Sequence, residues 1–71
     1  MSQNKIQVFI NGKKEYCDNE SSLYNFLKFL KISSNGIAIE INQTVVPKSE
    51  YKRKIIKKND RIEIVHFIGG G

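Results

Sequence analysis

The sequence predicts an α+β fold in which a four- to five-stranded sheet packs on one main helix. Several segments alternate apolar and polar residues as half-buried strands do, one segment has the apolar spacing of an amphipathic helix, and turn-forming residues separate them. The 71 residues suffice for one small domain and leave little room for an enclosed catalytic pocket. A binding module or carrier is therefore favoured over an enzyme.

A hairpin is predicted at the start of the chain. Residues 5–11 alternate with a period of two, and Asn11-Gly12 follows as a strong signal for a tight turn between antiparallel strands. The return strand is expected at residues 13–17, and it ends where a run of polar residues breaks the pattern.

One helix is predicted after Ser21-Ser22. Its apolar stripe follows the i, i+3, i+4, i+7 spacing and consists of Leu23, Phe26, Leu27 and Leu30. A serine before such a stripe is a typical N-cap, because its hydroxyl can accept a hydrogen bond from a free backbone N–H of the first turn. The stripe is expected to form part of the core.

Two strands are predicted next. Residues 37–41 alternate as a half-buried strand, and Asn42-Gln43 can turn the chain. The short strand Val45-Val46 ends at Pro47, because proline cannot donate to a sheet ladder.

The last strand is predicted at residues 61–67, after a loop with one irregular turn over residues 48–58 and a turn at Asn59-Asp60. If the alternating strands face the helix, the core contains the helix stripe and eight strand residues. These are Ile6, Val8, Ile10, Ile37, Ile39, Ile41, Ile62 and Ile64.

Two groups of residues are candidates for docking to other proteins. Alternation leaves Phe9, Val65 and Phe67 on the other face of the sheet as an apolar patch, although scattered apolar residues are also common on ordinary surfaces. The net charge of +5 is concentrated in Lys48, Lys52, Arg53, Lys54, Lys57, Lys58 and Arg61. This basic stretch is either a solvated face or a contact for an acidic protein. Nucleic acid is not expected, because a single tyrosine interleaves with it.

Composition excludes several function classes. The hydrophobic share of 39% and the charged share of 27% are those of a globular protein, and no stretch approaches the roughly 20 apolar residues of a membrane span. A single cysteine, Cys17, excludes an intramolecular disulfide and a cysteine-built zinc site, and it is interpreted as a small core residue. No metal cluster, nucleophile–base pair or phosphate loop appears, so no catalytic residue is expected.

The chain closes with Gly69-Gly70-Gly71, directly after an apolar strand. At a background frequency of about 7% per position, three glycines in a row arise by chance about three times in ten thousand. A frayed terminus is the competing interpretation. We expect a folded domain at residues 1–68 and a flexible tail at residues 69–71 without side chains, which can enter the narrow channel of an enzyme.

Three segments resemble the sulfur carrier proteins of the thiamine pathway. They are residues 41–48, with the pattern Asn-x-x-Val-Val-Pro-Lys, residues 60–64 and the terminal Gly70-Gly71. The resemblance implies a ubiquitin-like β-grasp fold with the first and last strands as parallel neighbours, which periodicity alone cannot show. Asn25, where the family often has an acidic residue, and the extra Gly69 depart from the pattern.

The resemblance also implies a chemistry. The carboxylate of Gly71 would be adenylated with ATP by an activating enzyme and converted to a thiocarboxylate, and its sulfur would pass to a thiazole synthase. A sulfur donor such as a cysteine desulfurase would serve it, and the chain itself would hold no permanent cofactor and no metal. We expect docking on Phe9, Val65 and Phe67 together with Lys52 and Arg53, in the cytoplasm or alternatively in the plastid stroma.

Three other functions stay open on sequence grounds. A molybdenum-cofactor sulfur carrier shares the fold and the tail chemistry but has a different sulfur acceptor, and a ubiquitin-like modifier would form isopeptide bonds with lysines. A small β-grasp RNA-binding domain has only the basic stretch in its favour. The segment at residues 42–47 favours the thiazole pathway.

Overall fold

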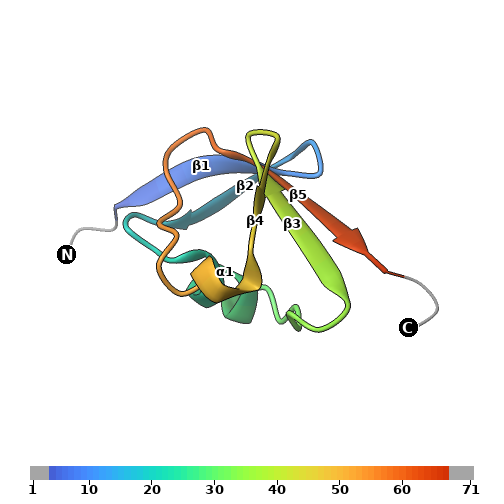
Figure 1. The fold of residues 1–71 in the computed structure, drawn as a ribbon. Helices are drawn as coiled ribbons and strands as arrows, with labels where there is room; N and C mark the ends of the chain where they lie inside the picture. Colours follow the sequence, from blue (N-terminus) through green and yellow to red (C-terminus); the bar gives the residue numbers. More distant parts are fainter. Residues whose placement is uncertain (1–3, 68–71) are drawn as a thin grey trace.

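The structure is a computed structural model that describes residues 4–67, and it contains one five-stranded sheet with a helix packed against one face (Figure 1). The predicted α+β fold is confirmed. The predicted tail at residues 69–71 lies outside the described residues. No helix in residues 4–67 is long and apolar enough to cross a membrane. The elements are β1 (Lys5–Ile10), β2 (Lys13–Asp18), α1 (Leu23–Phe29), β3 (Ile37–Ile41), β4 (Thr44–Val46), the 3₁₀ helix η1 (Lys48–Glu50) and β5 (Arg61–His66).

The strand order is β2-β1-β5-β3-β4, so the first and last strands lie side by side in the centre of the sheet. β1 and β5 are parallel, with Phe9 opposite Arg61 and Ile10 opposite Ile62. The other three pairs are antiparallel. The sheet is therefore mixed, as the resemblance to the β-grasp fold implied, and the strand that leads to the chain end is held between two neighbours.

Both hairpins turn on residues with positive φ. Asn11 and Gly12 have φ of 49° and 86°, and Asn42 and Gln43 have φ of 53° and 71°. Two-residue turns of this kind need a positive φ at both central positions, which asparagine and glycine tolerate best. The turn signals in the sequence are therefore confirmed by the backbone.

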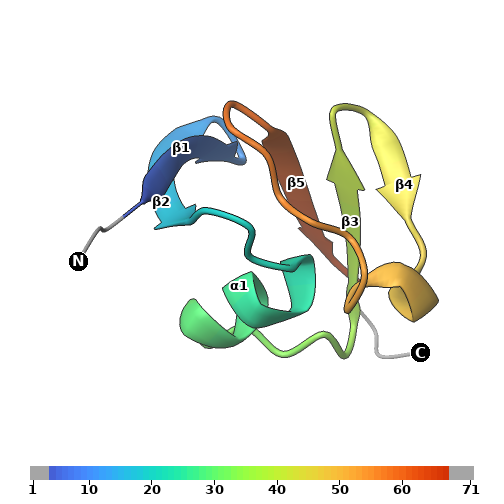
Figure 2. The same cartoon turned by 90° about the vertical axis from the view of Figure 1, so that its left-hand side faces the viewer.

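Helix α1 begins as the sequence predicts. Ser22 is extended, with φ −79° and ψ 158°, and its hydroxyl accepts a hydrogen bond from the N–H of Asn25 at 3.1 Å. The helix is only seven residues long and lies below the curved face of the sheet (Figure 2). At this length the isolated segment would not be helical in water, so α1 depends on burial of its apolar side.

The core matches most of the predicted set. Six of the eight predicted strand residues and three of the four predicted helix residues are buried, and the exceptions, Ile6, Ile10 and Leu30, are only partly buried beside the core. A helix of seven residues is too short to cover both ends of β1, which explains Ile6 and Ile10, and Leu30 is the C-cap that follows the helix. Cys17 is buried as expected, and three further buried residues complete the core: Val46, Tyr51 and Ile56.

Asn11 ties the first hairpin to the last strand. Its backbone N–H donates to the carbonyl of Ile62 at 2.8 Å. Its side-chain oxygen accepts from the N–H of Ile64 at 2.8 Å, and its side-chain nitrogen donates to the carbonyl of Ile64 at 3.3 Å. The Asn11 side chain thus continues the β1–β5 ladder where the backbone of β1 turns away.

We expect Asn11→Gly to lower the free energy of unfolding by about 1–3 kcal/mol, because the N–H and C=O of Ile64 lose their partner while the positive φ stays allowed. Urea unfolding measures the change. The matched control is Gln43→Gly, at an exposed turn position with a similar φ of 71°. An equal effect of both substitutions would mean that chain entropy, and not the side-chain clamp, explains the loss.

Candidate functional site

The base of the glycine tail is the end of β5. Pairing between the backbones of β1 and β5 ends at Ile62, so the following residues of β5 extend past β1. On its other side β5 keeps its pairing with β3: Ala38 lies opposite Val65, and the N–H of Phe67 donates to the carbonyl of Gly36 at 2.8 Å. The last described residues are thus held in an extended conformation that leads towards the tail. Gly69, Gly70 and Gly71 lie outside the described residues.

Val65 and Phe67 form an apolar patch at this base. Their side chains are 53% and 60% exposed, and alternation along the strand places both on the face of the sheet that does not contact α1, called the outer face below. Ala38, the neighbour of Val65 on β3, adds a small side chain to the same face. We call these three residues the tail-base patch, and large exposed apolar side chains of this kind mark candidate contact sites.

Phe9 does not join the tail-base patch, contrary to the sequence-based expectation. It is half-buried, and the guanidinium carbon of Arg61 lies 4.8 Å from the centroid of its ring. Because Phe9 is paired with Arg61, four residues before Val65, it lies about 13 Å from Val65 along the strand direction. A cation–π contact therefore covers the ring that the alternation pattern predicted to be free.

Lys52 and Arg53 also lie away from the tail-base patch. The ammonium of Lys52 lies 5.0 Å from the centre of the Tyr24 ring in α1, which places Lys52 on the helix side of the sheet. Arg53 donates to both carboxylate oxygens of Glu50, at 2.8 and 3.3 Å, and this hydrogen bonding raises the pKa of Arg53. The expectation that the basic and apolar docking residues share one side is wrong, because the segment between β4 and β5 crosses the helix layer.

The residues that carry the family resemblance in the middle of the chain have a structural role. The side-chain nitrogen of Asn42 donates to Asp60 at 2.9 Å, and its oxygen accepts from the N–H of Arg61 at 2.9 Å. The second carboxylate oxygen of Asp60 accepts from the N–H of Lys57 at 2.8 Å. Asn42 and Asp60 thus join the β3–β4 turn to the start of β5, a role that the sequence alone did not reveal.

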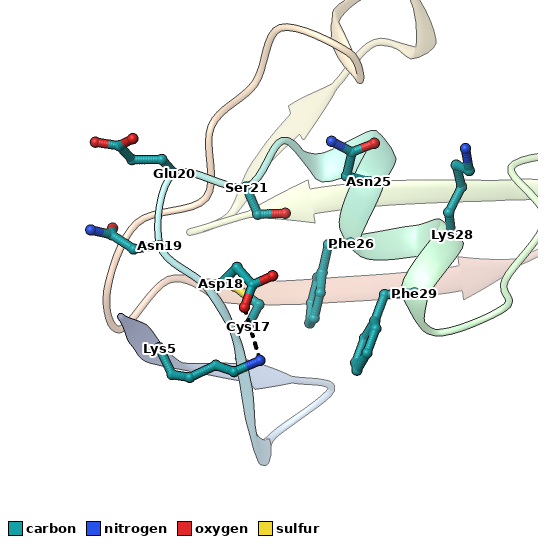
Figure 3. A pocket seen from close by; sticks show the side chains of 10 residues that line it. All are labelled: Lys5, Cys17, Asp18, Asn19, Glu20, Ser21, Asn25, Phe26, Lys28 and Phe29. Atoms are coloured by element: carbon teal, nitrogen blue, oxygen red, sulfur yellow. Dashed lines mark ion pairs between the residues drawn. The ribbon is translucent and has the colours of Figure 1, made fainter. Parts of the chain in front are cut away.

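An open pocket of about 550 Å³ lies between the end of β2 and α1 (Figure 3). Cys17 lies in its lining but is 3% exposed, and burial raises the pKa of its thiol, so it is not an activated nucleophile. Lys5 and Asp18 form an ion pair of 2.8 Å at the rim, and Phe26 and Phe29 come from α1. Among residues 4–67, no group of three or more metal-ligating side chains comes together. The pocket shows no catalytic arrangement.

Comparisons with known proteins agree with this geometry. The model of the ThiS family matches residues 4–71. A solved structure of a thiamine biosynthesis protein (ThiS) from Geobacter metallireducens superposes with a TM-score of 0.78 at 25% identity, over 93% of this chain and 100% of that one. The sulfur carrier protein ThiS of Escherichia coli is 27% identical over 93% of this chain and 100% of its own length.

Two further relatives extend the comparison. An uncharacterized protein of Porphyra purpurea, ycf40, is 37% identical over 100% of both chains. A thiazole synthase of Magnetococcus marinus is 32% identical over 93% of this chain, but the match covers only 20% of the synthase. One part of that synthase is therefore similar to this whole domain, and the rest of its length has no counterpart here.

Proposed function

The chain belongs to the ThiS family, the sulfur carriers of the thiamine pathway, and on that basis we propose that it carries sulfur on the carboxylate of Gly71. The carriers of this family are not enzymes, and the chain is acted upon by others. The observation that carries the proposal is the family match over residues 4–71, which includes the three terminal glycines.

The proposed chemistry needs activation from outside. A C-terminal carboxyl has a pKa of about 3.3 to 3.7, so at neutral pH it is an anion that is a poor electrophile but can attack phosphorus. One oxygen of the Gly71 carboxylate attacks the α-phosphorus of ATP in the activating enzyme, and pyrophosphate leaves. Sulfide from a donor then attacks the carbonyl carbon of the acyl-adenylate, AMP leaves, and a thiocarboxylate remains.

We further propose a thiazole synthase as the acceptor of the sulfur. The support is that a thiazole synthase of Magnetococcus marinus contains a segment similar to this domain, which is expected when a carrier and its acceptor work together. A cysteine desulfurase as sulfur donor, and the cytoplasm or plastid stroma as the place of action, stay predictions.

The tail-base patch is the proposed contact for the activating enzyme. It lies beside the point where the tail leaves the domain, so an enzyme that covers Val65 and Phe67 would also receive the tail. Three extended glycines reach about 10 Å, so the active site would lie within that distance of the contact.

We expect Phe67→Ala to raise the KM of the activating enzyme for the carrier about tenfold, because a large exposed aromatic ring at a contact contributes on this scale. Phe29→Ala is the matched control, since Phe29 is 68% exposed but lies on α1. Steady-state pyrophosphate release measures both. Equal KM values for the two variants would place the contact elsewhere.

The test of the proposed function is the intact mass of the chain after incubation with ATP, sulfide and the activating enzyme. Replacement of one carboxylate oxygen by sulfur should raise the mass by the difference between the two atoms. Omission of ATP should prevent the gain. If the complete mixture leaves the mass unchanged, the proposal fails.

A further inference from the structure

The segment between β4 and β5, residues 47–60, is the source of most of the net charge of the protein. It contains six basic and two acidic residues, which contribute +4 of the total +5. Both acidic side chains already have partners. Glu50 forms an ion pair with Arg53 at 2.8 Å, and Asp60 is 7% exposed and accepts a hydrogen bond from the N–H of Lys57. Within residues 4–67, no lysine of this segment forms an ion pair. We call residues 47–60 the basic connection.

The basic connection is fixed against the helix. The first free N–H groups of α1, those of Leu23 and Tyr24, donate to the carbonyls of Lys54 and Tyr51 at 2.7 and 3.0 Å. Tyr51 and Ile56 anchor the connection in the core, with exposures of 3% and 1%. The lysines therefore project from an ordered backbone, and little conformational entropy of the main chain would be lost when a partner binds.

The ring of Tyr24 joins the helix and the connection into one positive surface. The ammonium of Lys28 lies 5.4 Å from the ring centre and that of Lys52 lies 5.0 Å from it. Each cation–π contact is favourable, which helps to keep two like charges on one ring. An anionic group placed here would face both ammonium groups.

We propose that Lys28 and Lys52, together with the neighbouring basic connection, form a second docking surface for an acidic patch on the thiazole synthase that unloads the carrier. This inference rests on the proposed function and adds a contact to it. The second surface lies on the helix side and the tail-base patch lies on the outer face, so the two can contact different proteins. Charges at such a rim accelerate association more than they strengthen binding.

The geometry favours a protein over a nucleic acid as the partner. Sequence-tolerant binding of single strands needs exposed aromatic rings on which bases stack. Tyr51, the single aromatic residue of the basic connection, is buried, and the half-buried ring of Tyr24 is covered by two ammonium groups. The surface thus has positive charge but no exposed aromatic ring for a base to stack on. Such a surface is better suited to the carboxylates of an acidic protein than to a nucleic acid.

The test compares two double charge reversals of equal net charge, Lys28→Glu with Lys52→Glu and Lys13→Glu with Lys14→Glu. Lys13 and Lys14 are exposed in β2, which is not part of the basic connection. Stopped-flow association with the activating enzyme and with thiazole synthase is measured at 50 and 300 mM salt. We expect the first variant to associate about tenfold more slowly with thiazole synthase at low salt, with a smaller difference at high salt, and the control to stay near the wild type.

The outcomes separate this proposal from the proposed function. The mass gain of the wild type tests the chemistry of the tail, whereas the association rates test the surface alone. Equal rates of association with thiazole synthase for the two variants, or no binding to this enzyme, would overturn the docking surface. Binding of polyuridylate that is lost in the first variant, with unchanged rates for both enzymes, would replace it by a nucleic-acid surface. The double substitution Lys28→Arg with Lys52→Arg should associate at the wild-type rate, because it keeps both charges.

Discussion

A chain that carries a carboxamide in place of the terminal carboxylate of Gly71 should gain no sulfur at all. The carboxamide has no anionic oxygen at neutral pH, so it cannot attack the α-phosphorus of ATP and no acyl-adenylate forms. The sequence is unchanged, which makes this the closest available comparison with the wild type. Intact mass after incubation with ATP, sulfide and the activating enzyme measures the outcome.

Two further measurements on the carboxamide variant, its stability and its mass, are needed to interpret this result. The carboxamide should leave the midpoint of urea unfolding unchanged, because the described domain ends its last strand at His66. A mass gain in the carboxamide would contradict the proposal, because it would show that sulfur is added without the Gly71 carboxylate.

Shortening the glycine tail tests separately whether a terminal glycine carboxylate is needed and whether the length of the tail matters. Removal of one glycine leaves a chain that still ends in two glycines but is shorter by about 3.3–3.6 Å. This variant should still gain sulfur, more slowly than the wild type, whereas removal of all three glycines should abolish the gain. Equal rates for the wild type and the chain with two glycines would show that Gly69 contributes nothing to reach.

Phe26→Ala should unfold most of the protein. The side chain of Phe26 is 2% exposed and lies in the core between α1 and the sheet. Loss of a buried phenylalanine costs about 3–5 kcal/mol, while about 0.05–0.15 kcal/mol per residue places the total stability of a domain of this size at about 4–10 kcal/mol. Urea unfolding followed by circular dichroism measures the loss, and the midpoint should fall sharply or the transition disappear.

Phe29→Ala is the matched control, because it makes the same chemical change three residues later in the same helix. Phe29 is 68% exposed, so its removal should change the free energy of unfolding by less than about 0.5 kcal/mol. If both substitutions destabilise the domain equally, helix propensity and not burial of Phe26 holds α1 on the sheet.

The local elements could be predicted because each has a local cause. The N-cap at Ser22 follows from a hydroxyl and an N–H three residues apart, and the turn at Asn11-Gly12 follows from the tolerance of these residues for positive φ. The three partly buried exceptions in the predicted core, Ile6, Ile10 and Leu30, arose because the apolar pattern does not tell how far a short helix extends along the chain and over the sheet.

The candidate site could be predicted only in part. Val65 and Phe67 are exposed on one strand, as alternation indicates, since neighbours in the sequence decide which side of a strand they occupy. Phe9 was predicted to belong with them, but the partner that covers it, Arg61, is 52 residues away and reaches it through the parallel pairing of β1 with β5. No local pattern contains that pairing.

The sequence by itself determined the strands, the helix, the turns and the family resemblance, because these depend on residues within a few positions of one another. The tertiary structure alone decided that Asn42 binds Asp60, that Arg61 covers Phe9 and that Lys52 lies over Tyr24 on the helix side. These contacts join distant segments, and their partners are selected by how the sheet and helix pack. For that reason the separation of the apolar tail-base patch on the outer face from the basic surface on the helix side became visible only in the folded chain.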